Sequence, residues 1–211
     1  MTQPAPFAYP TSPHTHKHGP AGYAQYQYYK PWLRDEFVFR CVYCLTRETW
    51  GSSVIGHAEL GADHFEPKSL NEALVKTYTN LLYACNDCNR YRQTEPLPIN
   101  PLTTPLADHL IVDDQGRIVA KTTEGLDFID LFDLSAPGRN RLREDRLALL
   151  RAKQNHPEDP DIDALYRRAF GYPDVLPDLS SLDPPGGNAN LGSEKQCCHA
   201  LRLRNELPDV Y

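Results

Sequence analysis

The chain has 211 residues and a mass of 23.9 kDa, which suits one ordinary domain with irregular ends or two small ones. Its net charge is −6, its hydrophobic fraction is 40% and it contains 19 prolines, so we expect one modest core. No run approaches the roughly 18 apolar residues that span a bilayer, and the N-terminal stretch lacks the basic start and apolar centre of a secretory signal. These features argue against a membrane or secreted protein, and we expect a cytoplasmic one.

Residues 1–30 are rich in Pro, His and Tyr and show neither helical nor strand periodicity. We therefore expect a disordered or extended low-complexity arm. Within it, His14, His16 and His18 alternate along the chain. Such a triplet could bind a metal, but a solvated tail is the favoured interpretation.

Residues 31–96 carry most of the cysteines. The stretch SSVIGHAELGADHF is predicted to be a strand, YTNLLYAC a second strand, and NDCNRYRQ a short helix that ends before Pro96. His57 lies on the first of these strands. A structural role is favoured for it over a place in a functional cleft.

Residues 97–170 are expected to add a hairpin and a helical extension. HLIVDDQGRIVA has the pattern of a hairpin, and GLDFIDLFDLS and RNRLREDRLALLRAKQ have the pattern of helices. Residues 139–153, within the second helix, carry six Lys/Arg and two Asp/Glu. These basic residues suit either DNA phosphates or an ordinary solvated helix face, and the solvated face is favoured.

Residues 171–211 are rich in Pro, Gly, Ser and Asp at their start and are expected to form a linker and a C-terminal tail. Cys197, Cys198 and His199 lie near the end of this segment. Adjacent cysteines do not have a zinc-binding spacing, so these three residues carry no functional prediction.

Two C-x2-C pairs, CVYC and CNDC, are the strongest chemical signal in the chain. Cys41, Cys44, Cys85 and Cys88 offer four thiolates, which close a tetrahedral structural zinc site with no open position. Buried apolar cysteines and a redox-active dithiol are the weaker alternatives. Forty residues separate the two pairs, about twice the span of a simple zinc ribbon. The insert is therefore expected to hold something else.

The insert contains the stretch GADHFEPKSL, in which Asp63 and His64 are adjacent. Neighbouring side chains of a strand point to opposite faces, so these two share a site only if the backbone bends, and Pro67 suggests such a bend. Zinc would hold the start of the insert beside its end, where Asn89 follows the second cysteine pair. A carboxylate oxygen and an amide oxygen are ligands suited to Mg²⁺.

The elements DHFEP, TNLLYAC and CNDCNRYR occur in this order within residues 38–95, and together they resemble the HNH endonucleases of the ββα-metal fold. With the downstream INPLTTPLADHLIV, the chain looks most similar to stand-alone bacterial anti-phage HNH nucleases of the Septu and retron-associated type. The resemblance implies an α+β fold, in which a zinc-stapled ββα-metal core precedes a β-hairpin and a helical extension. It implies a metal-dependent endonuclease that hydrolyses phosphodiester bonds of DNA in bacterial antiviral defence.

The resemblance also implies the roles of individual residues. It assigns Asp63 and Asn89 to a catalytic Mg²⁺ or Mn²⁺, in addition to the structural Zn²⁺, and His64 to the general base. Asn80 matches the middle asparagine of the family, which fixes the active-site loop. An ATPase partner protein is expected, and an oligomer is left open.

Two residues in the matched region depart from the family pattern or carry further expectations. Arg92 stands where the family commonly has lysine, and with Lys68 it is expected to contact phosphate. Glu66 stands where an apolar or basic residue is commoner. It either adds a metal ligand or faces solvent, and solvent is favoured.

A noncatalytic zinc-binding module that binds nucleic acid or a protein partner is the alternative function. The acidic net charge and the lack of a clear basic recognition helix keep this alternative open. The sequence also leaves open whether the substrate is double-stranded DNA, single-stranded DNA or RNA.

Overall fold

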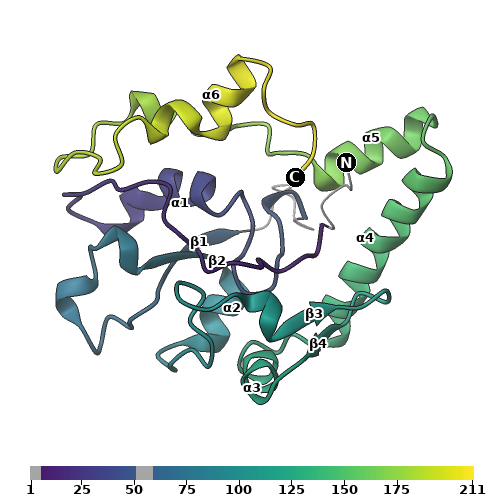
Figure 1. Cartoon of the computed structure of the whole chain (residues 1–211), viewed down its shortest axis with the longest axis horizontal. Coiled ribbons are helices and arrows are strands. Elements are labelled where there is room, and N and C mark those ends of the chain that lie inside the picture. Colours follow the sequence, from purple (N-terminus) through teal and green to yellow (C-terminus); the bar gives the residue numbers. More distant parts are fainter. Residues whose placement is uncertain (1–5, 51–58) are drawn as a thin grey trace. The chain divides into compact units, whose positions relative to one another are not determined.

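The computed structural model describes residues 6–50 and 59–211, which combine helices with two small antiparallel sheets (Figure 1). This agrees with the mixed class expected from the sequence. The chain forms two compact units. The described residues of the first unit are 6–15, 97–171 and 209–211, and those of the second are 16–50, 59–96 and 172–208.

The second unit contains two antiparallel strands followed directly by a helix. β1 (Leu60–His64) pairs with β2 (Leu81–Cys85), and α2 (Asn86–Arg92) begins where β2 ends. These elements confirm the predicted strand–strand–helix order. Residues 51–58, which include His57 and the start of the first predicted strand, lie outside the described residues.

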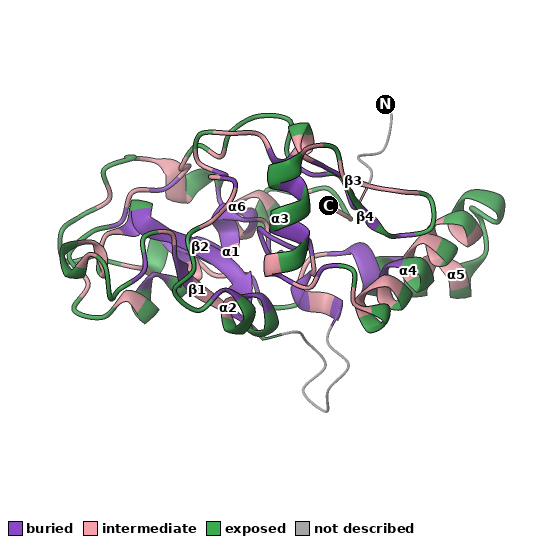
Figure 2. Cartoon of the chain, turned by 90° about the horizontal axis from the view of Figure 1, so that it is seen from below, coloured by how far each residue is buried: buried purple, intermediate pink, exposed green. Residues whose placement is uncertain are grey.

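β2 is buried along its whole length, because α1 (Lys30–Glu36) packs against it. α1 carries a proline in its first turn, where the missing N–H would have had no partner within the helix. Its Trp32 and Leu33 are buried together with Leu81 and Leu82 of β2. Figure 2 shows these buried segments together in the core of the unit.

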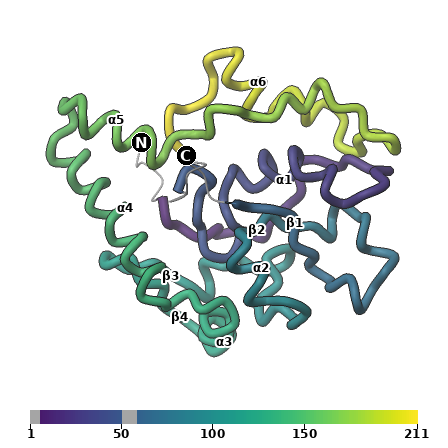
Figure 3. The backbone as a smooth tube through the Cα atoms, turned by 180° about the vertical axis from the view of Figure 1, so that it is seen from behind, coloured from purple at the N-terminus to yellow at the C-terminus, as the bar shows by residue number. Residues whose placement is uncertain are grey.

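Two segments from near the ends of the sequence complete the second unit and lie side by side (Figure 3). Ala21 N donates to Gly187 O at 2.9 Å, and Gly186 N donates to Ala21 O at 2.9 Å. A Cβ atom on Gly22, where φ is +83°, would lie 2.4 Å from Gly186 N, so this close approach requires glycine. α6 (Cys198–Leu203) follows in the same C-terminal segment.

The structure differs here from the expected free arm and linker. His18, predicted to lie in a solvated tail, is fully buried, and its ring contacts Asp35 and Ser193. Cys197 and Cys198 are also buried. Composition suggested free segments because it does not report hydrogen bonds between residues that are far apart in the chain.

The described residues of the first unit form a hairpin and three α-helices. β3 (Leu110–Val112) pairs with β4 (Ile118–Ala120), which confirms the predicted hairpin. α3 (Thr123–Leu131) and α4 (Pro137–Asn155) confirm the two predicted helices. α5 (Pro160–Phe170) packs against α4.

One arginine of the predicted basic face has a structural role in the first unit. Arg143 of α4 is buried and donates to Gly116 O at 2.5 Å and to Leu134 O at 2.7 Å. Gly116 lies in the hairpin turn with φ at +78°. Arg143 is therefore neither solvated nor available to a phosphate.

Short 3-10 helices connect these elements, at Tyr26–Tyr29, Glu48–Trp50, Glu72–Leu74, Tyr78–Asn80, Leu106–Asp108, Leu179–Ser181 and Ser193–Gln196. Among the described residues, no helix combines the length and the apolar character that a bilayer crossing requires.

Candidate functional site

The four cysteines of the two C-x2-C pairs converge in the second unit. All four sulfurs lie within 4.8 Å of one another, and Cys44 Sγ is 3.6 Å from Cys85 Sγ. A tetrahedral ion with Zn–S bonds of ~2.3 Å holds its sulfurs ~3.8 Å apart. The spacing, the burial and the soft donor atoms therefore fit Zn²⁺, as the sequence predicted.

The first cysteine pair is positioned by a tight turn that is attached to β2. Cys41 N donates to Thr46 O at 2.8 Å, and Leu45, which follows the second cysteine of the pair, takes a left-handed conformation with φ at +62°. Val42 N donates to Tyr83 O at 2.9 Å and joins the turn to β2. The second pair lies at the end of β2 and in the first turn of α2.

The environment of the thiols favours a bound cation. Burial raises the pKa of Cys41 well above its ordinary value, and the neighbouring thiols raise it further. A hydrogen bond with Cys41 lowers the pKa of Cys88, but Cys44, Cys85 and burial outweigh it, so this pKa is also well above its ordinary value. Four thiolates this close repel one another, and a dication removes that cost.

Asp63 is buried and held by two side chains. Its Oδ2 accepts from Tyr43 Oη at 2.5 Å and from Arg92 Nη1 at 2.8 Å. Tyr43 lies inside the first cysteine pair and Arg92 ends α2, so the carboxylate joins the turn of that cysteine pair to the helix. Oδ1 of Asp63 makes no hydrogen bond to any described residue, and it is the oxygen available to a hard cation.

His64 follows Asp63 in β1 but contacts a different set of groups. Its Nε2 lies 2.9 Å from Val75 O, and the ring of Tyr26 meets the imidazole edge-on at a centroid distance of 4.6 Å. A carbonyl oxygen only accepts, so Nε2 carries the proton and Nδ1 keeps its lone pair. Burial lowers the pKa of His64, and the positive charges of Lys68 and Arg92 lower it further, against the Val75 hydrogen bond and Asp63, which raise it.

The side chain of Asn80 forms hydrogen bonds with the loop that follows β1. Its Oδ1 accepts from Glu66 N at 2.8 Å, and its Nδ2 donates to Glu66 O and Leu74 O, both at 3.2 Å. The side chain is buried, and its backbone oxygen also accepts from Phe65 N at 2.8 Å. These contacts are of the loop-fixing kind that the resemblance implies for this residue. The side chain of Glu66 itself is exposed, in agreement with the solvent-facing interpretation.

Arg92 is not placed to contact phosphate. Its side chain is fully buried and donates to Asp63, to the carbonyl oxygens of His64 and Phe65, and to Glu95 O at 3.2 Å. A guanidinium has five N–H donors, and these contacts use four of them. The expected phosphate contact is therefore corrected to a structural one, in which Arg92 fixes Asp63 and the end of β1.

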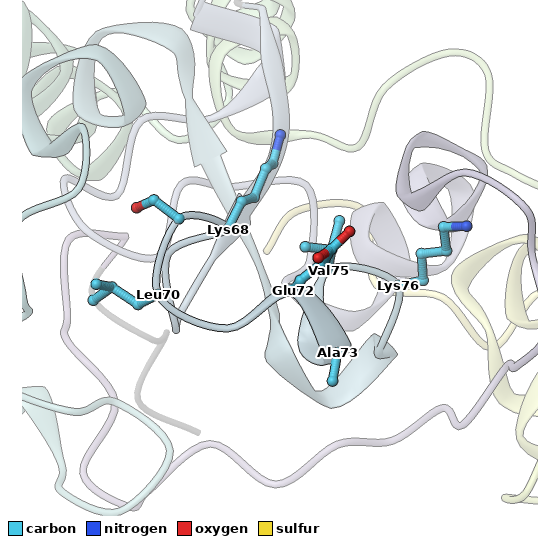
Figure 4. Close-up of a pocket in the computed structure, with 7 residues that line it drawn as sticks. Lys68, Leu70, Glu72, Ala73, Val75 and Lys76 are labelled. Atoms are coloured by element: carbon cyan, nitrogen blue, oxygen red, sulfur yellow. The ribbon is translucent and has the colours of Figure 1, made fainter.

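Lys68 is exposed and lies beside the predicted base. Its Nζ donates to Tyr26 Oη at 2.8 Å and lies 4.0 Å from the centroid of the same ring. It also lines a groove of about 730 Å³ formed by the loop between β1 and β2. In the view of Figure 4, Glu72 and Val75 lie between Lys68 and Lys76 along this groove. Because Val75 O holds His64, the groove runs next to the imidazole.

The structure therefore brings some of the predicted site residues together and not others. The four cysteines converge, and Asn80 fixes the loop after His64. The side chains of Asp63 and His64 share no hydrogen-bond partner, since β1 continues through both residues and directs them to different faces, although Arg92 also donates to the backbone oxygen of His64. Asn89 is half-buried in α2, and its side chain makes no hydrogen bond to any described residue.

Comparison of the chain with known protein families, curated proteins and solved structures finds no relative. The chain matches no family model, no curated protein and no solved structure.

Three groups of the site were missed by sequence reasoning. They are the hydroxyl of Tyr43, the carbonyl of Val75 and the ring of Tyr26. Tyr43 lies within CVYC, a motif that predicts a function only for its cysteines. The Val75 carbonyl belongs to the backbone, so the identity of the residue does not indicate its role. Tyr26 lies 38 positions before His64, in a segment whose composition suggested disorder.

Proposed function

We propose that the chain is a metal-dependent endonuclease of the HNH type that hydrolyses phosphodiester bonds of DNA. The observation that carries this proposal is the arrangement of His64, whose Nε2 is held by the Val75 carbonyl. The motif resemblance provides the reaction class, and the imidazole geometry fits the role that the resemblance gives to this residue.

His64 has the properties of a general base. The Val75 carbonyl selects the tautomer with the proton on Nε2, so Nδ1 can take a proton from an attacking water. Because burial lowers the pKa of this histidine, the neutral form is favoured at neutral pH. The fixed ring also avoids the entropy cost of finding the reactive orientation in each turnover.

Asp63 and Asn89 are the residues that would hold a catalytic Mg²⁺ or Mn²⁺. When bound, such an ion would neutralise charge on the phosphate and on the departing 3′ oxygen. The buried partner of Asp63 is the cation of Arg92, so this pair has no net charge. We therefore expect weak metal binding by the free protein and tighter binding when substrate phosphate adds its negative charge.

The substrate and partner follow from the resemblance and from the charge. Lys68 is exposed next to the His64 site and can pair with a phosphate of the bound strand. The net charge of −6 gives little general attraction to nucleic acid. An ATPase partner that delivers DNA, within an antiviral defence system, would compensate for this weak attraction.

A cleavage assay with a matched pair of histidine variants tests the proposal. Zinc-loaded wild type should nick plasmid DNA when magnesium is added and stop when it is chelated. His64→Ala should lose cleavage by at least ~100-fold while keeping its zinc and its thermal unfolding. His156→Ala, which changes an exposed histidine at the end of α4, should cut like wild type.

The same assay separates the alternative, a noncatalytic zinc-binding module. The observation that favours it is the engagement of Asp63 Oδ2 with Tyr43 and Arg92, which is a structural use of the predicted metal ligand. Such a module would hold zinc, bind nucleic acid and show no divalent-dependent hydrolysis. Equal cutting by wild type and His64→Ala would remove His64 from the mechanism.

A further inference from the structure

We propose that Tyr26 is a positioning residue, whose ring sets the orientation of the His64 imidazole. This inference deepens the proposed function and rests on it, because it concerns the same predicted base. Tyr26 belongs to the N-terminal segment and lies outside the part of the chain that carries the HNH resemblance.

The Val75 hydrogen bond alone leaves the plane of the His64 ring undetermined. A hydrogen bond at Nε2 fixes one atom of His64, but the torsion that turns a histidine ring has broad minima and does not fix the ring plane by itself. The edge-on contact with Tyr26, at 4.6 Å between centroids and 74° between planes, supplies a second constraint. Together the two contacts determine where Nδ1 points.

The ring of Tyr26 is itself held in place by Lys68. Lys68 Nζ donates to its hydroxyl at 2.8 Å and lies 4.0 Å from its ring centroid, so the ring is fixed by a cation–π contact and a hydrogen bond. Tyr26 therefore connects Lys68, the residue expected to bind phosphate, to His64. A purely space-filling aromatic would not need a polar partner.

Neighbouring residues of the N-terminal segment hold Tyr26 beside His64. Tyr29, in the same 3-10 helix, is buried, and its hydroxyl donates to Lys76 O at 3.1 Å, at the other end of the groove loop. Further back, the backbone N–H groups of Lys17 and His18 donate to the carboxylate of Glu36, at 2.7 and 2.9 Å. The segment is thus anchored on both sides of Tyr26.

Steady-state cleavage by zinc-loaded variants tests the role. Tyr26→Leu removes the ring and should lower kcat roughly 10- to 100-fold with KM nearly unchanged. Tyr26→Phe keeps the ring and should retain most of kcat. Tyr28→Leu is the matched control, since Tyr28 lies in the same 3-10 helix and is 54% exposed, and it should behave as wild type.

A second measurement reports on His64 without requiring cleavage. NMR of zinc-loaded protein with labelled histidine should show one tautomer, protonated at Nε2, in wild type, Tyr26→Phe and Tyr28→Leu. Tyr26→Leu should keep this tautomer, which the Val75 carbonyl selects, but the carbon-bound ring protons of His64 should shift or broaden because the ring plane is no longer fixed. If Tyr26→Leu does not fold, Tyr26→Met takes its place.

The outcomes distinguish this inference from the proposed function. Wild-type kcat and an unchanged His64 signal in Tyr26→Leu would overturn the positioning role, even if His64→Ala is inactive. A wild type that cuts no nucleic acid, combined with a Tyr26-dependent His64 signal, would overturn the nuclease proposal and leave the positioning of the ring in place. A loss of kcat in Tyr28→Leu equal to that in Tyr26→Leu would also contradict the inference.

Discussion

At the scale of single residues, the site depends on Asp63 and His64, two neighbours whose side chains have different contacts. Asp63 and His64 are adjacent in β1, yet the carboxylate contacts Tyr43 and Arg92 while the imidazole contacts Val75 and Tyr26. This follows from the alternation of side chains along a strand. The two positions are still connected through Arg92, which donates to the Asp63 carboxylate and to the backbone oxygen of His64.

The Asp63–Arg92 pair is buried, so removing either member should leave an uncompensated charge. The exposed fractions of the two side chains are 6% and 1%. Asp63→Asn and Arg92→Met should each lower the free energy of unfolding by about 3 kcal/mol. The double variant should cost about as much as one single variant, because the two residues form one interaction. Urea unfolding of the zinc-loaded proteins measures these values.

A partly exposed ion pair of the first unit provides the control. Lys153→Met removes one of the two cations that pair with Asp163, the other being Arg167. The exposed fractions of Lys153 and Asp163 are 22% and 32%, so the change should cost less than ~1 kcal/mol. Additive effects in the Asp63→Asn/Arg92→Met variant would show that the two residues are not coupled.

At the scale of elements, β2 connects the zinc site to the loop that carries the predicted base. Cys85 ends the strand, and Leu81, at its other end, pairs in register with His64. Asn80, just before the strand, holds the loop after β1 by a hydrogen bond. A zinc ion held by the four cysteines would therefore stabilise one end of β2, whose other end orients the site.

The zinc site predicts a definite pattern of thiol reactivity. Native zinc-loaded protein should contain one zinc and show almost no reactive thiol, because burial raises the pKa of Cys198 to about 12 and Cys197 is fully buried. Chelation should expose at least the four clustered thiols, and denaturation should expose all six. Thiol titration together with metal analysis tests this pattern and the redox alternative.

Two serine variants give the matched comparison for the zinc site. Cys85→Ser removes a thiolate from the cluster and should lose zinc and lower the unfolding temperature. Cys197→Ser changes an equally inaccessible cysteine outside the cluster and should keep one zinc. Full zinc content in Cys85→Ser would contradict the four-thiolate site.

At the scale of the whole molecule, the second unit is assembled from segments that are distant in sequence. Asp35 of α1 joins them: its Oδ2 contacts His18 Nε2 and Lys17 Nζ, both at 2.8 Å, and its Oδ1 accepts from Cys198 N at 2.6 Å. One buried carboxylate thus ties the N-terminal and C-terminal segments to the helix that covers β2.

Asp35 should make the stability of this unit dependent on pH in the acid range. Burial raises its pKa, but the hydrogen bond with His18 and the charge of Lys17 outweigh this and lower the pKa from 3.8 to about 2. Its contribution is therefore complete above pH 3.8 and is lost as pH falls through about 2. The shift corresponds to about 2 kcal/mol at neutral pH.

Comparison of Asp35→Asn with wild type at each pH measures this contribution. Asp35→Asn should have a lower free energy of unfolding than wild type at neutral pH, and the difference should shrink as pH falls from 3.8 toward 2. In the acid range the zinc-binding thiolates are protonated in both proteins, which lowers the stability of each. The test is therefore the difference in stability between Asp35→Asn and wild type at each pH, and not the loss of stability in either protein. Asp87→Asn, at an exposed position in α2, should show no such difference.

The elements that sequence reasoning predicted well are those whose signal is local. The thiol spacing predicted the four-cysteine cluster, apolar runs between turn residues predicted β2 and the hairpin, and leucines on a common helix side predicted α4. The N-terminal segment was misjudged because proline and tyrosine content resembles a solvated arm. Its order comes from distant partners such as the carboxylates of Asp35 and Glu36.

The sequence by itself determined the donor set for zinc and the strand–strand–helix order, because both depend on residue chemistry and on patterns within a few residues. Only the tertiary structure decided that Arg92 is buried against Asp63, 29 positions away, and that Ser193 contacts His18 across 175 positions. It also decided that Val75 and Tyr26 orient His64. Such contacts depend on how folded segments approach one another, and no spacing along the chain encodes that approach directly.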